Sequence, residues 1–261
     1  MWAMNCILLV APLMLTTFGY VRAEQPLTAD CDRYTAPGVQ DDKIDAGVAI
    51  LACQKAVRQF PTNLRLIYQL GRSYNAGKQY TDAIETFRKA ANEGFGPAQI
   101  DLGGMYWLGR GVPRNYAEAV RWNRLAADQE IASAQFNLGS AYELGRGVTQ
   151  NSEMAVKWYS LAANQGFAMG QWALGSLYER GYGVQQSYSQ AVDWYRKATE
   201  HGLSVAQYSL GLMYETGRGV PKNTAQALIL FRSATAQGYK PAADEASKLE
   251  AARGPLAAST K

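Results

Sequence analysis

The stretch LGGMYWLGRGV, residues 102–112, recurs three more times at a fixed distance in this chain of 261 residues. The copies are LGSAYELGRGV at 138–148, LGSLYERGYGV at 174–184 and LGLMYETGRGV at 210–220, so the period is 36 residues. A period between about 20 and 50 residues is typical of a solenoid, in which each unit buries its apolar face only against its neighbours. The sequence therefore predicts a repeat array.

Each repeat has the pattern of two helices joined by a glycine turn. In residues 96–131, Leu102 and Tyr106 lie at helical spacing on one face of a first helix. The second half of the repeat places alanines and a tryptophan at the same kind of spacing. Between the halves, Gly109 and Gly111 are free to take positive φ, which lets the chain reverse direction. We therefore expect an antiparallel helix pair in every repeat.

Two further features recur every 36 residues at the second helix of the repeats. One is a tryptophan expected to be buried, and the other is a residue suited to cap the start of the helix. Trp122, Trp158 and Trp194 recur at 36 residues and are predicted to be buried. Asparagine or serine recurs just before the helix, where its side chain can accept a hydrogen bond from the first turn. These predicted N-cap residues are Asn115, Asn151, Ser187 and Asn223.

The four copies, each followed by an alanine-rich second helix, resemble the Sel1-like repeat family, which is related to tetratricopeptide repeats. The resemblance implies an all-α fold, a right-handed superhelical solenoid of antiparallel helix pairs. Four full repeats would span 96–239, and 61–95 is similar to a shorter tetratricopeptide-like repeat. We expect an N-terminal capping segment at 24–60, with a helix around 45–59. A capping helix and tail should follow at 240–261.

The N-terminus has the features of a secretory signal peptide. Residues 6–18, CILLVAPLMLTTF, are apolar and lead to the small-residue sequence Val21-Arg22-Ala23. This pattern predicts cleavage after Ala23, so that residues 1–23 are removed. The stretch is shorter than a transmembrane helix requires, so no stable membrane span is expected after its removal. We predict a periplasmic or secreted bacterial protein, with an uncleaved N-terminal anchor as the alternative.

Removal of the signal would leave two cysteines, Cys31 and Cys53. An even pair in an exported protein indicates a disulfide, because oxidising compartments let such bonds persist. We expect the bond to cross-link the N-terminal cap, and two free thiols are the alternative.

Charge and side-chain types argue against several classes of function. The net charge is +4 and no block of basic residues occurs, so nucleic acid is not expected as a partner. The chain has one histidine, His201, which leaves no nucleophile–base dyad of the usual kind and no metal-ligand spacing. The glycine turns follow helices rather than strands, which does not fit a phosphate-binding loop. We predict no enzyme activity, no cofactor and no metal.

In tetratricopeptide-like superhelices the first helix of each pair lines a concave groove, and the resemblance implies three rows of groove residues here. The first row is aromatic in four of five repeats, and the third row carries three carboxylates at the repeat spacing. The first row consists of Tyr68, Ile100, Phe136, Trp172 and Tyr208. The second row consists of Arg72, Gly104, Ser140, Ser176 and Leu212. The third row consists of Asn75, Trp107, Glu143, Glu179 and Glu215.

Aromatic side chains are common energetic centres of recognition surfaces, and an acidic row would favour Lys or Arg on a ligand. We therefore predict binding of a protein or peptide segment in the groove. Packing of the aromatic row against the next helix is the alternative explanation. The predicted binding residues are Tyr68, Arg72, Trp107, Phe136, Glu143, Trp172, Glu179, Tyr208 and Glu215.

The leading functional prediction is a non-enzymatic scaffold or adaptor for protein–protein interaction. An alternative is binding of cell-wall glycan or peptide fragments, because aromatic faces stack on sugars and the acids could engage amino groups. A β-lactamase-like hydrolase is the third possibility. Cysteine-rich members of the resembled family are linked to that activity, but their repeated cysteine pairs are missing here.

Overall fold

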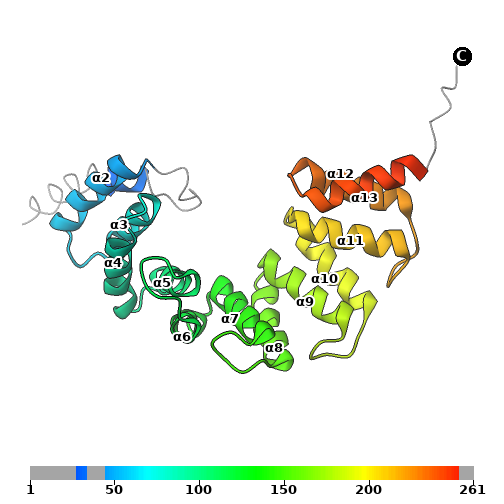
Figure 1. Ribbon diagram of the computed structural model, residues 1–261, viewed down its shortest axis with the longest axis horizontal. Coiled ribbons are helices and arrows are strands. Elements are labelled where there is room, and N and C mark those ends of the chain that lie inside the picture. The colour runs from blue at the N-terminus through cyan, green and yellow to red at the C-terminus, as the bar shows by residue number, and fades with distance from the viewer. Residues whose placement is uncertain (1–27, 34–44, 253–261) are drawn as a thin grey trace, which may run out of the picture. The chain divides into compact units, whose positions relative to one another are not determined.

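The computed structural model describes residues 28–33 and 45–252 (Figure 1). All regular secondary structure in these two ranges is helical, and consecutive helices pack on one another within residues 46–92 and within residues 116–252. The predicted fold class, an all-α solenoid of antiparallel helix pairs, is confirmed. The signal peptide predicted at 1–23 and the tail after Ala252 lie outside the described residues.

The chain divides into two compact units, Met1–Ala98 and Gln99–Lys261. In the first unit, α2 (Ala46–Gln59) packs against α3 (Leu64–Ala76), which packs against α4 (Tyr80–Asn92). The helix expected around 45–59 corresponds to α2, and α3 with α4 is the helix pair of the shortened repeat.

The predicted disulfide joins Cys31 to Cys53 of α2. Both cysteines are fully buried and pack with Ala56, Leu66 and Leu70 in one apolar cluster. The bond therefore ties the helical residues 28–33 to the two helices that begin the array.

The second unit contains the four full repeats and a final helix. The first three residues of α5 belong to the first unit, the helices from α5 to α12 form four pairs, and α13 follows them. Their bounds are α5 Gly96–Leu108, α6 Tyr116–Ala127, α7 Ala132–Leu144, α8 Ser152–Asn164, α9 Ala168–Arg180, α10 Tyr188–Glu200, α11 Ser204–Thr216, α12 Thr224–Ala236 and α13 Lys240–Ala252.

The second helices begin where their cap residues predict. Each cap side chain accepts a hydrogen bond from the backbone N–H three residues on, which satisfies one of the donors left free at a helix start. The cap-to-amide contacts are Asn115 to Glu118, Asn151 to Met154, Ser187 to Gln190 and Asn223 to Gln226, at 2.9–3.3 Å.

A glycine in the first helix lets an aromatic ring of the second helix lie directly against the backbone. A Cβ atom on Gly139 would lie 2.5 Å from Cδ1 of Tyr159, inside van der Waals contact, so only glycine accommodates this ring. Four of the described repeats contain the same arrangement. The pairs are Gly71–Phe87, Gly139–Tyr159, Gly175–Tyr195 and Gly211–Phe231.

Buried glutamines link the two helices of a repeat at their other end. In three full repeats a glutamine after the second helix donates a side-chain hydrogen bond to a buried glutamine of the first helix. These pairs are Gln129–Gln99, Gln165–Gln135 and Gln237–Gln207, at 2.8–2.9 Å. In the third full repeat, His201 takes the place of the donating glutamine, and Gln171 donates to the carbonyl oxygen of Ala163 at 3.3 Å.

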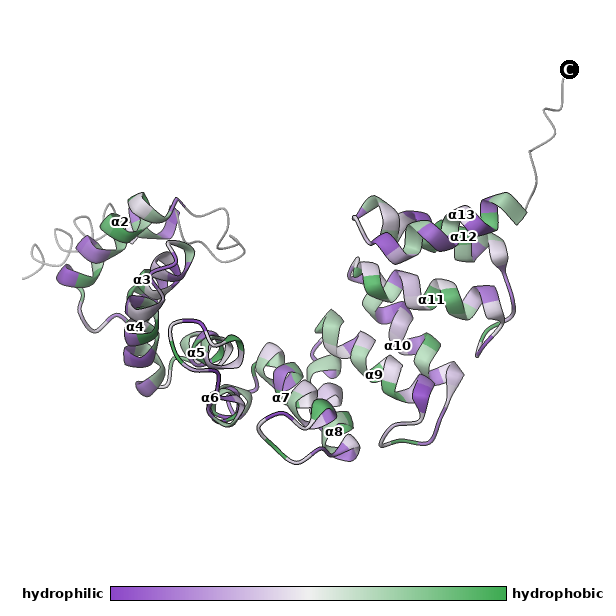
Figure 2. Cartoon of the chain, viewed as in Figure 1, coloured by the Kyte–Doolittle hydropathy of each residue, from purple (hydrophilic) through white to green (hydrophobic). Residues whose placement is uncertain are grey.

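The prediction of three buried tryptophans is correct at two positions. Trp122 and Trp158 are 4% and 8% exposed, whereas Trp194 is only partly buried, with the ammonium of Lys197 lying 3.9 Å from its ring centroid. Both hydrophobic and hydrophilic residues occur along the repeat helices, as Figure 2 shows. Within residues 28–33 and 45–252 no helix combines the length and the apolar character needed to cross a bilayer.

Candidate binding site

All nine predicted binding residues lie on the first helix of a pair, and all nine are partly buried. Tyr68 and Arg72 belong to the first unit and the other seven to the second unit. The structure brings Phe136, Glu143 and Trp172 together at a cavity of about 190 Å³ between α7 and α9. We call the surface formed by the first helices α5, α7, α9 and α11 the first-helix face.

The aromatic row contributes to packing within the array. The ring of Phe136 lies 5.5 Å from that of Tyr159 on its own second helix and 5.7 Å from Phe167 just before α9. Trp172 donates its indole N–H to the hydroxyl of Ser209 on α11 at 3.1 Å. The packing explanation therefore accounts for part of this row. The other matching ring contacts are Tyr68 with Phe87 and Phe95, and Tyr208 with Phe231 and Tyr239, at 5.3–5.9 Å.

Two carboxylates of the third row already have partners inside the chain. Glu143 accepts a hydrogen bond from the hydroxyl of Tyr159 at 2.8 Å and pairs with Arg180 at 2.6 Å. Glu179 accepts from the hydroxyl of Tyr195 at 2.7 Å. These contacts join the two helices of a pair. Because both carboxylates already have partners, the acidic row by itself does not predict Lys or Arg on a ligand.

We expect Tyr159 and Tyr195 to stay protonated at a pH where exposed tyrosines ionise. Burial, followed by the charges of Glu143 and Glu179, raises the pKa of each phenol above its ordinary value of 10.0. Because the folded-state pKa exceeds the unfolded one, this stabilisation is complete below about pH 10 and is lost as the pH rises further. An absorbance titration of tyrosinate should therefore show more ionisation after unfolding than before it.

The variant Tyr159→Phe provides the control for this titration. It should remove one late-ionising phenol while the chain remains helical, since phenylalanine occupies the same position at residue 231. Ionisation of every tyrosine in a single step, with the helical circular dichroism intact, would contradict the contacts with Glu143 and Glu179.

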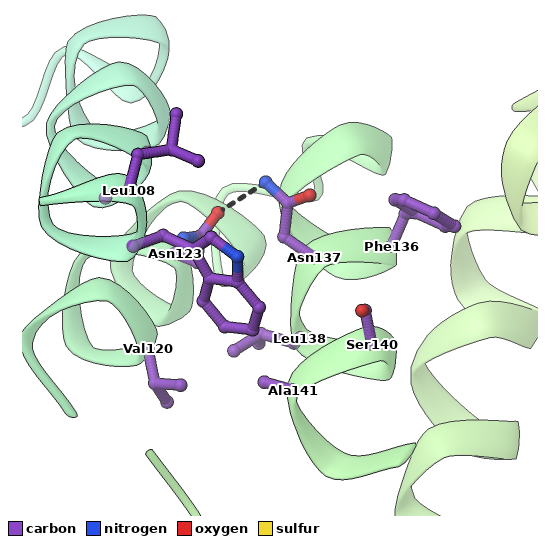
Figure 3. A pocket seen from close by; sticks show the side chains of 11 residues that line it. Leu108, Val120, Asn123, Phe136, Asn137, Leu138, Ser140 and Ala141 are labelled. Atoms are coloured by element: carbon purple, nitrogen blue, oxygen red, sulfur yellow. Dashed lines mark hydrogen bonds between the residues drawn. The ribbon is translucent and has the colours of Figure 1, made fainter. Parts of the chain in front are cut away.

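A second cavity, of about 240 Å³, lies among α5, α6 and α7 of the second unit (Figure 3). We call it the Asn123 pocket. Figure 3 shows Asn123 facing Asn137, with Leu138 and Ala141 on the same wall as Asn137. The pocket is defined by Gly103, Trp107, Val120, Asn123, Phe136 and Ser140.

The pocket has its own lining because the first full repeat departs from the others at three positions. Asn123 stands where the other described repeats have the aromatic ring that covers the helix glycine, here Gly103. Gly104 replaces a serine or leucine, and a Cβ atom there would meet nothing within 4 Å. Trp107 stands where the other full repeats have a glutamate, which accepts a hydrogen bond from a tyrosine hydroxyl in the second and third of them. The equivalent place in the next repeat, beside Tyr159, holds a cavity of about 190 Å³, so the three changes enlarge a space that recurs on this face.

Hydrogen bonds hold the amide of Asn123 in place. Its Nδ2 donates to the carbonyl oxygen of Ala119 at 2.8 Å, and its Oδ1 accepts from Nδ2 of Asn137 at 2.8 Å. The Oδ1 atom of Asn137 points away from Asn123 (Figure 3). The guanidinium of Arg146 lies 5.8 Å from the ring centroid of Trp107. The pocket thus combines apolar walls with the polar side chains of Asn123, Asn137 and Ser140, and a cation lies nearby.

The sequence-based rows missed Asn123 and Asn137, although they include Trp107, Phe136 and Ser140. The sequence does contain a feature that could have indicated this pocket. The residue 20 positions after the first-helix glycine is aromatic in the last three full repeats and asparagine in the first. In the described ranges no group of three or more His, Cys, Asp or Glu side chains could hold a metal ion. The geometry is suited to binding an apolar group.

Comparison with known proteins agrees with the repeat architecture. Residues 96–130, 132–167, 168–203 and 204–239 match the Sel1 repeat. Among curated proteins no match to this sequence is found.

Solved structures show the same fold. A protective antigen present in uropathogenic Escherichia coli strains, which displays an SLR fold, is 32% identical with a TM-score of 0.74. The match covers 94% of this chain and 53% of that protein, so this chain spans about half of its length. A Sel1 repeat protein from Oxalobacter formigenes is 36% identical with a TM-score of 0.59, over 66% of this chain and 70% of that one.

The helix pairs and their shared face define a repeat solenoid with a candidate binding surface. The chain belongs to the Sel1 repeat family. Proteins built from Sel1 repeats are generally non-enzymatic scaffolds for protein–protein interaction.

Proposed function

We propose that this chain is a non-enzymatic scaffold that binds a segment of a partner protein on the first-helix face of its second unit. The main support is that two cavities open next to each other on this face and share Phe136 and Ser140. Both lie along successive first helices, where an extended or helical segment could contact several repeats at once. Solenoid proteins commonly bind their partners on an extended surface formed by successive repeats.

We also propose that the protein works in the periplasm or outside the cell. The apolar stretch at 6–18 followed by small residues is the pattern of an export signal. The Cys31–Cys53 disulfide supports the same compartment, because such bonds persist where the surroundings are oxidising.

A photo-crosslinking amino acid placed on the first-helix face tests the scaffold proposal. Ser140 and Ser176 are suitable positions because both are small, partly buried and line the cavity between α7 and α9. Ser233, which is exposed on α12, is the matched control. We expect one envelope protein to be captured from Ser140 and Ser176 and not from Ser233.

A blocking substitution completes the experiment. Ser176→Arg should prevent binding of the captured protein, once purified, while the circular dichroism of the helices is retained. Blocking is preferable to removing Phe136, Trp172 and Tyr208. Loss of the two smaller rings would remove ring packing within a repeat, and loss of the tryptophan would remove a hydrogen bond between repeats. Equal capture from all three crosslinking positions would show that the binding surface lies elsewhere.

A further inference from the structure

We propose that the Asn123 pocket receives one phenylalanine or tyrosine ring of the bound partner segment. This inference deepens the proposed function, on which it rests. It names the chemical group that the first full repeat recognises and the residues that recognise it.

The shape of the pocket follows from the ring that is missing. In the second, third and fourth full repeats, and in the short repeat, an aromatic ring lies directly on the glycine of the first helix. At Gly103 that place is taken by the smaller amide of Asn123, whose Nδ2 atom is the nearest atom to an added Cβ, at 2.5 Å. The cavity here, of about 240 Å³, is larger than the cavity of about 190 Å³ beside Tyr159 in the next repeat, and a ring from another molecule can fill it.

The size of the cavity also points to a single side chain. Its volume of about 240 Å³ is smaller than the roughly 300–1,000 Å³ typical of pockets for small-molecule ligands. A phenyl or phenol ring carried on an extended segment needs less room, and the rest of the segment stays on the open face.

The walls are suited to an aromatic group. Trp107 and Phe136 both line the space, and aromatic rings gain from tilted or edge-on contact with one another. A glutamate at position 107 would place a carboxylate here without the tyrosine hydroxyl that partners Glu143 and Glu179. Tryptophan at 107 keeps this wall free of a carboxylate.

A polar atom is available to orient the ring. Oδ1 of Asn137 is directed away from Asn123 and can accept a hydrogen bond from an O–H or a backbone N–H of the segment (Figure 3). In a pocket that is mostly apolar, a small number of polar groups commonly fixes the orientation of the bound group.

The substitution Asn123→Tyr tests the proposal by filling the pocket with a ring of the chain itself. The new ring should lie on Gly103 as Tyr159 lies on Gly139, so the melting temperature should not fall. The probes are N-acetyl-tyrosinamide and N-acetyl-phenylalaninamide, with N-acetyl-alaninamide for comparison. We expect saturation-transfer NMR on the whole chain to show ring contact, and Asn123→Tyr to weaken it about tenfold or more.

Two further variants keep the test decisive. Ile229→Tyr adds the same ring on the exposed face of α12 and should leave binding of the aromatic probes unchanged. Gly104→Leu fills the pocket from α5 with the residue found at position 212, and should also weaken probe binding. It replaces Asn123→Tyr as the blocking variant if that chain fails to fold.

Several results would overturn the inference. Aromatic probes that bind no better than N-acetyl-alaninamide, or that bind the blocked variants equally well, would contradict a ring site. A dimer of this chain that Asn123→Tyr converts to a monomer would show that a second copy occupies the pocket, and the assignment to a partner protein would be wrong.

The crosslinking experiment separates this inference from the proposed function. If Ser140 and Ser176 capture a partner but no aromatic probe binds, the scaffold proposal stands and the ring site fails. If the probes bind and the blocked variants lose them, yet no partner is captured, the ring site stands and the scaffold proposal fails.

Discussion

Replacing Gly147 by alanine is expected to destabilise the second unit by about 3 kcal/mol, because backbone strain and a backbone clash coincide. The φ angle of Gly147 is 76°, a left-handed conformation that alanine adopts at a cost of about 1–2 kcal/mol. An added Cβ would also lie well inside contact distance of the carbonyl of Tyr116 and 2.9 Å from the amide nitrogen of Ala117. Backbone atoms cannot move aside as a flexible side chain can.

The clash lies at the contact between successive repeats. Gly147 belongs to the turn of the second full repeat, whereas Tyr116 begins the second helix of the repeat before it. Gly183 and Gly219 stand in the same relation to Ser152 and Tyr188. Because the stability of a solenoid is largely the sum of its repeats and their nearest-neighbour interfaces, the loss should weaken the coupling between the first two full repeats.

Gly202→Ala is the matched control for this prediction. Gly202 has the same φ of 76°, but an added Cβ would meet nothing within 4 Å. The control should therefore show only the conformational cost, about 1–2 kcal/mol. Urea unfolding followed by circular dichroism measures both variants, and equal losses of stability would contradict the proposed backbone contact at Gly147.

Much of the fold could be predicted from the sequence because its determinants are local and repeated. The cap residues, the turn glycines and the apolar faces agree in every full repeat, so each one reinforces the others. The disulfide was also predictable, because only Cys31 and Cys53 remain after the expected signal peptide. These features need no knowledge of which helices lie opposite one another.

The candidate site could be predicted only in part, because its form depends on contacts across helices. The rows on the first helices identify residues that share a face, but not what fills the space beside them. Whether a pocket opens at Gly103 depends on Asn123 of the next helix. Likewise, sequence spacing does not reveal that the Tyr159 hydroxyl reaches Glu143 and uses part of the acidic row.

Reduction of the Cys31–Cys53 disulfide is expected to lower the free energy of unfolding of the first unit by about 3 kcal/mol. The bond closes a loop across a sequence separation of 22 residues, and the chain-entropy model gives about this value for such a loop. The cysteines form the centre of the apolar cluster between residues 28–33, α2 and α3. Hydrogen exchange under reducing conditions should therefore accelerate in α2 and α3, while α11 and α12 of the second unit keep their protection.

The double variant Cys31→Ala/Cys53→Ala is the control, since reductant should change nothing in a chain without the bond. Unchanged protection of α2 on reduction of the native chain would show that packing alone holds the cap. A selective loss would mean that the first unit reaches its full stability only where cysteines are oxidised. That requirement would favour a site of action outside the cytoplasm on grounds independent of the N-terminal apolar stretch.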